Sequence, residues 1–260
     1  MSVFISLERV GKTYHTRTGS VQAVAQASFD VRRGEFVSLL GPSGCGKSTL
    51  LMMVAGLEVP SVGRLVVDGE AVTGPRKDNG IIFQDATLLP WKSVLENVLF
   101  PVDILKRPRR EFESRARQLI QRVGLGGFEA KKPHELSGGM RQRVAICRAL
   151  IHEPQVLLMD EPFSALDAIT RDQMNLVLAD MLQHDDKTVL FVTHSIREAV
   201  YLSDRVLVMG GRPSTITLDL RVDFPRPRAV EIEDDPRFRE MVRALRASIQ
   251  QGHGNVVPAH

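Results

Sequence analysis

A glycine-rich loop between an apolar strand and a helix is the feature that most constrains how this chain folds. Gly41 is followed, after four further residues, by Gly46, Lys47 and Ser48, and the apolar run 36–40 leads directly into it. Behind the loop the apolar spacing becomes helical and stops near a glycine. This strand–loop–helix order predicts an α/β core built around a phosphate-binding loop.

The loop has the composition that phosphate binding requires. Its glycines let successive backbone N–H groups turn inward around a phosphate, and the following helix adds its positive end. We expect Lys47 to reach the β- and γ-phosphates of ATP, Ser48 to ligate Mg²⁺ and Thr49 to contact the α-phosphate. The alternative is a glycine-rich turn without a ligand, and the flanking strand and helix argue against it. The expected nucleotide contacts are Gly41, Pro42, Ser43, Gly44, Cys45, Gly46, Lys47, Ser48 and Thr49.

Two acidic residues follow a second apolar run. Residues 156–159 predict a buried strand, and Asp160 and Glu161 come directly after it. Beside a phosphate loop, Asp160 is placed to hold Mg²⁺ through water, and Glu161 to orient or deprotonate the attacking water. Alone the pattern is weak, since many strands end in acids. Together with the loop it predicts ATP hydrolysis as well as ATP binding.

A second anion-binding feature lies between these two segments. Ser137 is a suitable helix N-cap, and Gly138 and Gly139 behind it expose backbone N–H groups. An ordinary capped helix is the alternative. One chain that binds one nucleotide has little use for two γ-phosphate sites. The single chain therefore does not explain this second anion-binding segment.

The rest of the sequence indicates a β-rich start, a helical middle and an α/β second half. Residues 3–7 and 21–31 are typical of strands, and residues 88–127 are largely helical in pattern. Strands and helices alternate after that stretch, which implies a parallel sheet with crossover helices. Further expected strands are 36–40, 64–67, 80–83, 156–159, 188–192 and 205–209, and further expected helices are 137–151, 168–183, 196–202 and a tail helix reaching about residue 250.

Composition limits the partners and the compartment. The net charge of +3 argues against nucleic-acid binding by electrostatics alone. The two cysteines, Cys45 and Cys147, fit a reducing compartment, and we expect both to fill space. The start lacks the order of a signal peptide, and the longest apolar run, 50–57, is too short to span a bilayer. Work at a membrane would therefore require a partner.

Residues 136–143, which read LSGGMRQR, resemble the signature of the ATP-binding cassette (ABC) ATPases, and the resemblance covers residues 2–209. In that family the signature of one subunit closes over ATP held by the phosphate loop of another, so the resemblance implies a head-to-tail homodimer. It also implies the ABC ATPase fold, a P-loop core with a mixed sheet, an antiparallel β subdomain and an α-helical subdomain. The implied domains are 1–87 (β subdomain and P-loop core), 88–152 (helical subdomain with the signature), 153–211 (remainder of the core) and 212–260 (C-terminal extension).

The resemblance assigns roles to further residues. Gln84 matches the family's glutamine loop, which touches Mg²⁺ or the catalytic water and senses the membrane partner. Asp167 matches the loop that crosses the dimer interface, and His194 matches the switch histidine at the γ-phosphate. Tyr14 matches the aromatic residue that stacks on adenine; an aromatic on an early strand is also commonly core. The expected catalytic residues are then Glu161, His194, Gln84 and Lys47, the metal ligands Ser48, Gln84 and Asp160, and the nucleotide contacts from the second copy Ser137, Gly138, Gly139 and Asp167.

One stretch of the helical region resembles a particular branch of the family. Residues 88–98, with Trp91 among them, look like the importers for nitrate, taurine and aliphatic sulfonates. Met140, where the family most often has Gln, and the Pro/Arg run 224–228 agree. The resemblance implies transmembrane permease subunits that dock near residues 84–98, a separate solute-binding protein and a peripheral place on the cytoplasmic face of the inner membrane. Single residues of the string could be core, but as a string they favour a docking surface.

Two other functions remain open at this point. A soluble ABC-type ATPase that acts on nucleic acid or ribosomes would carry long coiled coils or two cassettes, and this sequence has neither. A nucleotide switch that does not hydrolyse ATP would not need Lys47, Glu161 and His194 together. The transported solute cannot be read from the sequence. For the 212–260 extension we expect a packing or dimer-stabilising role.

Overall fold

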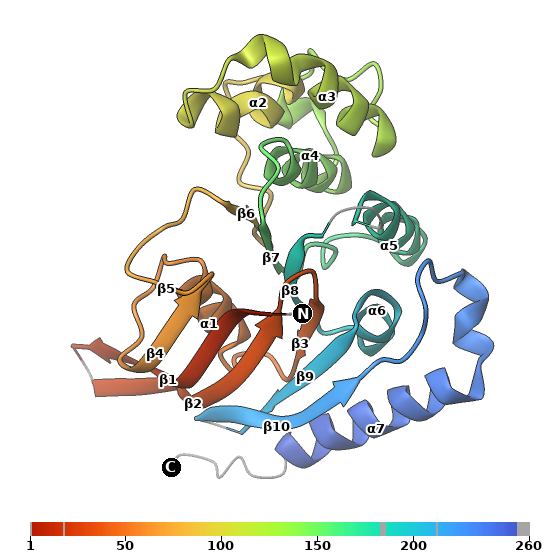
Figure 1. Cartoon of the computed structure of the whole chain (residues 1–260). Helices are drawn as coiled ribbons and strands as arrows, with labels where there is room; N and C mark the ends of the chain where they lie inside the picture. The colour runs from red at the N-terminus through yellow and green to blue at the C-terminus, as the bar shows by residue number, and fades with distance from the viewer. Residues whose placement is uncertain (1, 18, 183–185, 212, 254–260) are drawn as a thin grey trace. The chain divides into compact units, whose positions relative to one another are not determined.

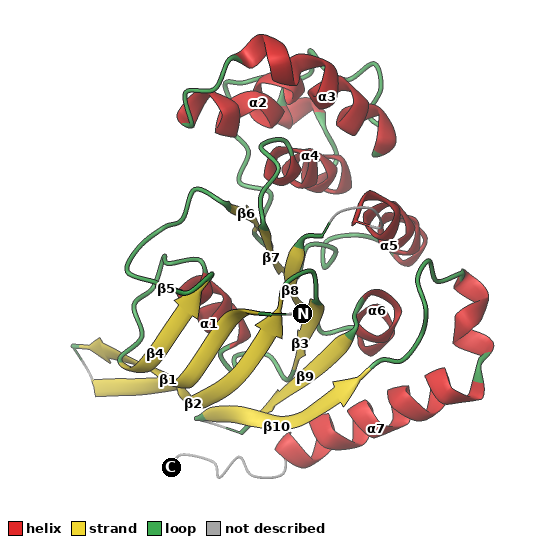
Figure 2. Cartoon of the chain, in the orientation of Figure 1, coloured by secondary structure: helices red, strands yellow, loops and turns green. Residues whose placement is uncertain are grey.

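The computed structural model has the α/β fold that the sequence predicts (Figures 1 and 2). The described residues are 2–17, 19–182, 186–211 and 213–253. They fall into two compact units, one formed by residues 1–76 with 186–260 and the other by residues 77–185. The glycine-rich loop belongs to the first unit and the signature segment to the second.

The first unit begins with antiparallel strands. β1 (Val3–Thr16) pairs with β2 (Gly19–Arg32) and with β4 (Val62–Val67), and β4 pairs in turn with β5 (Glu70–Ala71). The strands predicted at 3–7 and 21–31 are confirmed, and β1 and β2 extend as far as their connection. Most side chains of that extension are exposed, so it lacks the apolar alternation that marks a half-buried strand.

A parallel core follows in the same unit. β3 (Phe36–Leu40) lies between β8 (Thr188–Val192) and β9 (Arg205–Gly210) and runs parallel to both, as predicted. Every residue of β3 and β8 is buried, which explains why both are apolar apart from Ser38 and Thr188. α1 (Lys47–Val54) follows β3, and α6 (Ile196–Leu202) connects β8 to β9. Within this unit the strand order is β5-β4-β1-β2-β10-β9-β3-β8.

The C-terminal extension contributes to this sheet. β10 (Ser214–Arg221) pairs antiparallel with β9 and parallel with β2. A 3-10 helix, η2 (Val230–Asp234), leads into α7 (Pro236–His253), which packs on β9, β10 and α6 and lies along β10 in Figure 1. The tail helix was predicted. β10 was not predicted, although Ile216, Leu218 and Leu220 alternate there with exposed polar residues, which is the pattern of a half-buried strand.

The second unit consists of two parallel strands and their helices. β6 (Asn79–Ile82) pairs with β7 (Val156–Asp160), as predicted from their apolar runs. α4 (Gly138–Leu150) packs against α2 (Val94–Ile104), α3 (Arg109–Arg122) and β6, and its Cys147 is fully buried, which confirms a packing role for that thiol. Gln183, the predicted end of the helix after β7, lies outside the described residues. The helices of this unit are α2 (Val94–Ile104), α3 (Arg109–Arg122), η1 (Pro133–Glu135), α4 (Gly138–Leu150) and α5 (Ala168–Leu182).

Candidate active site

The glycine-rich loop leaves β3 in a tight turn against the neighbouring strands. A Cβ on Gly41 would lie 2.4 Å from the Met209 carbonyl oxygen, and one on Gly46 would lie 2.7 Å from the Ala23 carbonyl oxygen. Gly46 has a φ of 96° and is the N-cap of α1, and none of the described side chains caps that helix. The start of such a helix favours an anion, so the phosphate site stays a prediction at this position.

The Lys47 side chain folds into this loop. Its Nζ donates to the carbonyl oxygens of Gly41 and Pro42, at 2.9 Å each, and the residue is only 5% exposed. Cys45 is buried as well, with its Sγ 4.0 Å from that Nζ, and so fills space as predicted. A buried ammonium group held by two carbonyl dipoles is a preformed binding element for phosphate oxygens.

Tyr14 lies half-buried on the ribbon formed by β1 and β2. It pairs with Val21, two residues before the Ala23 carbonyl that touches Gly46. The Lys12 ammonium lies 5.0 Å from the centre of the Tyr14 ring. The ring is thus presented on a strand next to the loop rather than buried in the core.

His194 lies at the same edge of the sheet as the loop. β8 runs parallel to β3, and the Thr193 N–H donates to the Leu39 carbonyl oxygen at 3.3 Å, so the two strands end side by side. His194 is exposed there, between β8 and α6. The N-terminus of α6 is well held: Ser195 Oγ accepts from the Glu198 N–H, and Thr193 Oγ1 donates to the buried Glu198 carboxylate at 2.6 Å. The carboxyl ends of adjacent parallel strands are where α/β folds bind their ligands.

In the second unit, the two acids lie at the end of β7. Asp160 is its last residue and is 6% exposed. Glu161 is half-buried and has a φ of 44°, a left-handed conformation that is unfavourable for a residue with a side chain. Ser164 stabilises the turn, because its N–H and its hydroxyl group both donate to the Glu161 carbonyl oxygen. Strained residues of this kind cluster at functional sites.

The signature segment opens α4 in the predicted way. Ser137 is its N-cap and accepts from the Met140 N–H at 3.2 Å. A Cβ on Gly139 would lie 2.8 Å from Leu166 Cδ2, so the loop before α5 packs directly on the signature. In that loop the exposed Asp167 carboxylate accepts from the N–H and the hydroxyl group of Thr170, and these hydrogen bonds lower the pKa of Asp167.

Gln84 is exposed, in a loop that α4 holds. Gln142 is 3% exposed and its Nε2 donates to the Phe83 carbonyl oxygen at 3.0 Å. The Arg148 guanidinium donates to the carbonyl oxygens of Ala86 and Thr87. Sequence reasoning missed these two supporting residues. The available signal was a polar side chain, Gln142, among the apolar positions of α4.

The segment predicted to dock, residues 88–98, contains both buried and exposed side chains. Val94 and Val98 are buried, whereas Trp91 is 69% exposed. Asn97, which is fully buried, holds the turn that carries Trp91: its Oδ1 accepts from the Leu89 N–H and its Nδ2 donates to three carbonyl oxygens of the same turn. Asn97 was also missed, although an asparagine in an apolar helix is a signal for such a role.

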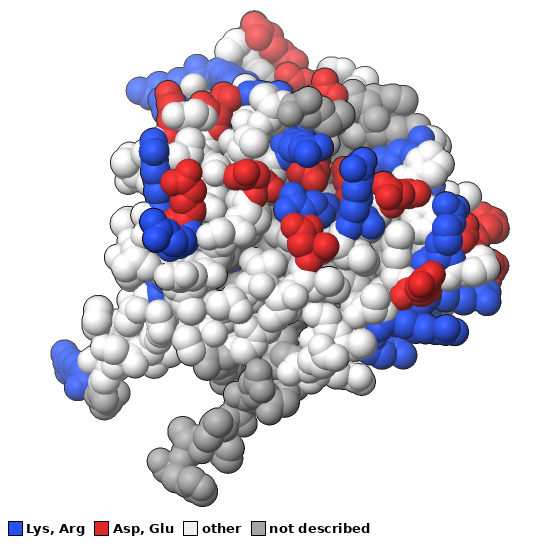
Figure 3. All heavy atoms as spheres, turned by 60° about the horizontal axis from the view of Figure 1, so that its bottom comes forward, with Lys and Arg blue, Asp and Glu red and all other residues white. Residues whose placement is uncertain are grey.

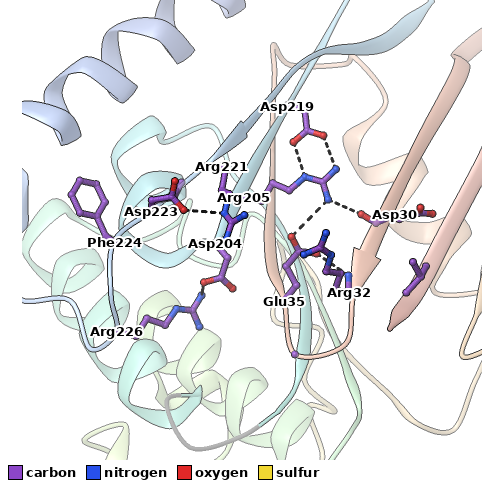
Figure 4. Close-up of a pocket in the computed structure, with 13 residues that line it drawn as sticks. Asp30, Arg32, Glu35, Asp204, Arg205, Asp219, Arg221, Asp223, Phe224 and Arg226 are labelled. Atoms are coloured by element: carbon purple, nitrogen blue, oxygen red, sulfur yellow. Dashed lines mark hydrogen bonds and ion pairs between the residues drawn. The ribbon is translucent and has the colours of Figure 1, made fainter. Parts of the chain in front are cut away.

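A pocket of the first unit lies away from the glycine-rich loop. A pocket of about 960 Å³ lies at the start of β3, the end opposite to the glycine-rich loop (Figure 4). Its charges are largely paired within the wall; Arg205, for example, donates to both carboxylate oxygens of Asp219 and to the Asp30 carbonyl oxygen. Figure 3 likewise shows Lys and Arg side chains interspersed with Asp and Glu, separated by uncharged surface.

The predicted site residues are thus distributed over both units. The loop, Tyr14 and His194 belong to the first unit, and Gln84, the signature, the two acids and Asp167 belong to the second. The described residues contain no group of three or more His, Cys, Asp or Glu side chains able to hold a metal ion. An exposed hydroxyl such as that of Ser48 suits Mg²⁺, which commonly takes one or two protein ligands and completes its shell with phosphate oxygens and water.

Comparison with known proteins relates this chain to ABC transporters. Residues 24–164 match the family model described as "ABC transporter". The taurine import ATP-binding protein TauB of Rhizobium johnstonii is 45% identical over 95% of this chain and 93% of its own length. The aliphatic sulfonates import ATP-binding protein SsuB of Bacillus cereus is 41% identical over 92% of this chain and 94% of its own. A dimeric ATP-binding cassette solved in a post-hydrolysis state with ADP and Pi superposes with a TM-score of 0.75, at 31% identity, over 85% of this chain and all of that one.

Among the helices that the structure describes, none has the length and apolar character needed to span a bilayer.

Proposed function

The chain belongs to the ATP-binding cassette transporter family, and we propose that it is the ATPase subunit of an importer for nitrate, a sulfonate or taurine. Because it belongs to this family, the chain binds and hydrolyses ATP, forms dimers and acts together with membrane permease subunits. The choice of solute rests on the relatives, two of which are named as sulfonate and taurine import proteins. The alternative of a soluble ATPase acting on nucleic acid or ribosomes is not favoured by these relatives.

For the nucleotide we propose the roles that the motifs suggest. Lys47 exchanges its two loop carbonyl partners for β- and γ-phosphate oxygens when ATP enters the loop. The backbone N–H groups at the start of α1 hold the phosphates, and the half-exposed ring of Tyr14 stacks on adenine. Mg²⁺, held by Ser48, Gln84 and Asp160, would neutralise phosphate charge.

For hydrolysis we propose that Glu161 acts on the attacking water. As general base it takes a proton from that water, while His194 donates a hydrogen bond to the γ-phosphate. The strained turn at Glu161, fixed by Ser164, supports a precisely aimed carboxylate. The signature residues Ser137, Gly138 and Gly139 and the carboxylate of Asp167 would come from a second copy, arranged head to tail.

The proposed setting is the cytoplasmic face of the inner membrane. Permease subunits would contact residues 84–98, where Trp91 is exposed and Gln84 lies on a loop held by α4. A solute-binding protein would deliver the solute to the permease. In this scheme residues 1–87 and 153–211 form the ATPase core, residues 88–152 the permease-facing subdomain and residues 212–260 the extension.

The decisive experiment compares the wild type with Glu161→Gln. We expect the variant to bind ATP and to dimerise, but to release phosphate at least about 100-fold more slowly. Glu135→Gln is a matched control, since Glu135 is an exposed acid of the same unit that pairs with Lys131. Equal phosphate release by Glu161→Gln and wild type would overturn the assignment of the base. Uptake of nitrate, taurine and an alkanesulfonate into vesicles that hold the reconstituted complex would test the solute.

A further inference from the structure

The Pro/Arg run after β10 carries a buried arginine. Arg228 is only 8% exposed, and its guanidinium lies at the C-terminal end of α6. Nη1 lies 3.1, 2.8 and 2.8 Å from the carbonyl oxygens of Val200, Tyr201 and Ser203. The Tyr201 hydroxyl donates back to the Arg228 carbonyl oxygen at 2.8 Å. One side chain from the extension therefore holds most of the last turn of α6.

Arg226 completes this arrangement. Its Nη2 donates to the Leu202 carbonyl oxygen at 2.8 Å and pairs with the Asp204 carboxylate at 3.0 Å, a pair visible in Figure 4. Asp204 in turn accepts from the N–H of Phe36, the first residue of β3. The two arginines thus connect the C-terminus of α6 to the start of the strand that leads into the phosphate loop.

The chemistry of this contact suits its position. The last carbonyl groups of a helix have no partner within the helix, and the helix dipole makes that end negative, so a cation there is favourable. Burial and the neighbouring Arg226 charge lower the pKa of Arg228 to about 10, which leaves it protonated at neutral pH. A planar guanidinium presents its donors in a rigid fork and is more weakly hydrated than an ammonium group, so it suits a buried contact with several carbonyl groups.

The other end of the same helix is the functional end. α6 has only seven residues and is about 10 Å long, and His194 lies two residues before it. Ser195 and the pair of Thr193 with Glu198 hold that end. A helix this short transmits a displacement of one end to the other, since it contains no loop or bend in between.

We propose that Arg228 and Arg226 are positioning residues for ATP hydrolysis, which hold α6 by its C-terminus and so fix His194 at its N-terminus. This rests on the proposed contact of His194 with the γ-phosphate. The extension then does more than pack on the sheet. It affects the rate of ATP hydrolysis although none of its atoms contacts ATP, and it does not affect the affinity of the loop for ATP.

The test uses the full chain and separates rate from binding and from stability. In Arg228→Ala we expect kcat for phosphate release to fall by roughly 10-fold or more, while the Kd for a fluorescent ATP analogue stays within about two-fold. Arg228→Lys should recover part of the rate. Arg226→Ala, which loses a single carbonyl contact and one ion pair, should show a smaller fall. The matched control is Arg205→Ala, which breaks contacts to Asp219 and Asp30 in the same unit but none to α6.

A double variant decides whether the effect passes through His194. If it does, Arg228→Ala added to His194→Ala lowers kcat no further, because the residue being positioned is already gone. Additive losses, an unchanged kcat in Arg228→Ala, or losses in Arg228→Ala and Arg205→Ala that simply follow their Tm values would overturn the proposal. Should Arg228→Ala not fold, Arg228→Lys and Arg226→Ala give the same comparison. A wild type without ATPase activity would refute the proposed function itself, whereas an active His194→Ala would refute only the role of His194 and this inference with it.

Discussion

Leu166 fills the space that a side chain at position 139 would need, with its Cδ2 2.8 Å from where a Cβ on Gly139 would lie. The signature segment and the loop before α5 are therefore one packed piece of the second unit. In the proposed dimer both segments face the second copy. A displacement of one segment therefore displaces the other.

Gly139→Ala should impair hydrolysis without loss of ATP binding to the loop. The added methyl group must displace Leu166 or the start of α4. The loop of Leu166 holds Asp167 and the start of α4 holds the signature, and both are proposed to complete the site of the second copy. We expect phosphate release to fall by roughly 10-fold or more, with an unchanged Kd for the ATP analogue. Gly126→Ala is the control, since a Cβ there would lie 4.0 Å from its nearest neighbour, Gln121 Cγ. Full activity of Gly139→Ala would contradict the prediction.

Lys47→Met should weaken nucleotide binding. Hydrogen bonds to charged groups contribute about 1.5–3 kcal/mol, so the Kd for ATP should rise by roughly 10- to 150-fold. Titration with a fluorescent ATP analogue measures the change. Lys131→Met, which removes an exposed ammonium paired with Glu135, should leave the Kd unchanged. Equal affinities of the two variants would show that the loop lysine does not contact the phosphates.

Substitution of Asn97 should affect stability, whereas substitution of Trp91 should affect docking to the permease. Asn97→Ala removes the four hydrogen bonds that hold the turn before α2, and should lower the free energy of unfolding by about 2–4 kcal/mol. Trp91→Ala should leave stability within about 0.5 kcal/mol, because the ring is largely exposed, yet should reduce co-purification with the permease. Chemical denaturation and pull-down measure the two effects. A Trp91→Ala chain that retains its permease would contradict the docking surface.

His152 should make the stability of the second unit dependent on pH. The residue is 7% exposed, and burial, with the Arg107 charge beside it, lowers the pKa of its imidazole below the ordinary value of 6.5. Below pH 6.5 the unfolded chain therefore binds a proton that the folded chain does not, and the free energy of unfolding falls as the pH falls. Above pH 6.5 both states are neutral there and this effect vanishes. Denaturation at pH 7.5 and 5.5 should show a smaller difference for His152→Gln than for the wild type.

Strands and loops with a strong local pattern were predictable from sequence. β3, β8 and α6 have the predicted bounds, because buried parallel strands are continuous apolar runs and Ser195 is a clear N-cap. The outer ribbon of β1 and β2 and the strand β10 were not predictable in full. The extended ends of β1 and β2 carry no apolar alternation. The residues of β10 do alternate, but its pairing with β2, a strand distant in the sequence, is not marked by any local pattern.

The motif residues of the candidate site were predictable, whereas their supports were not. Glycine spacing and an acid after an apolar run are local signals. Gln142 and Arg228 act by bonding to carbonyl groups of other segments, 59 residues away in the case of Gln142. Nothing local marks such a partner, so these contacts emerge only from the packed structure.

The place of β10 also has a consequence for how the chain is made. Ser214 Oγ donates to the Ala23 carbonyl oxygen across 191 residues of sequence, at the point where β10 lies between β2 and β9. During synthesis β2 emerges well before β10, whereas β9 comes directly before it, and until β10 arrives each of the two strands has an unpaired edge. The sheet of the first unit becomes continuous only when β10 has been synthesised. A chain that ended after β9 would keep those two edges exposed for good, and should aggregate.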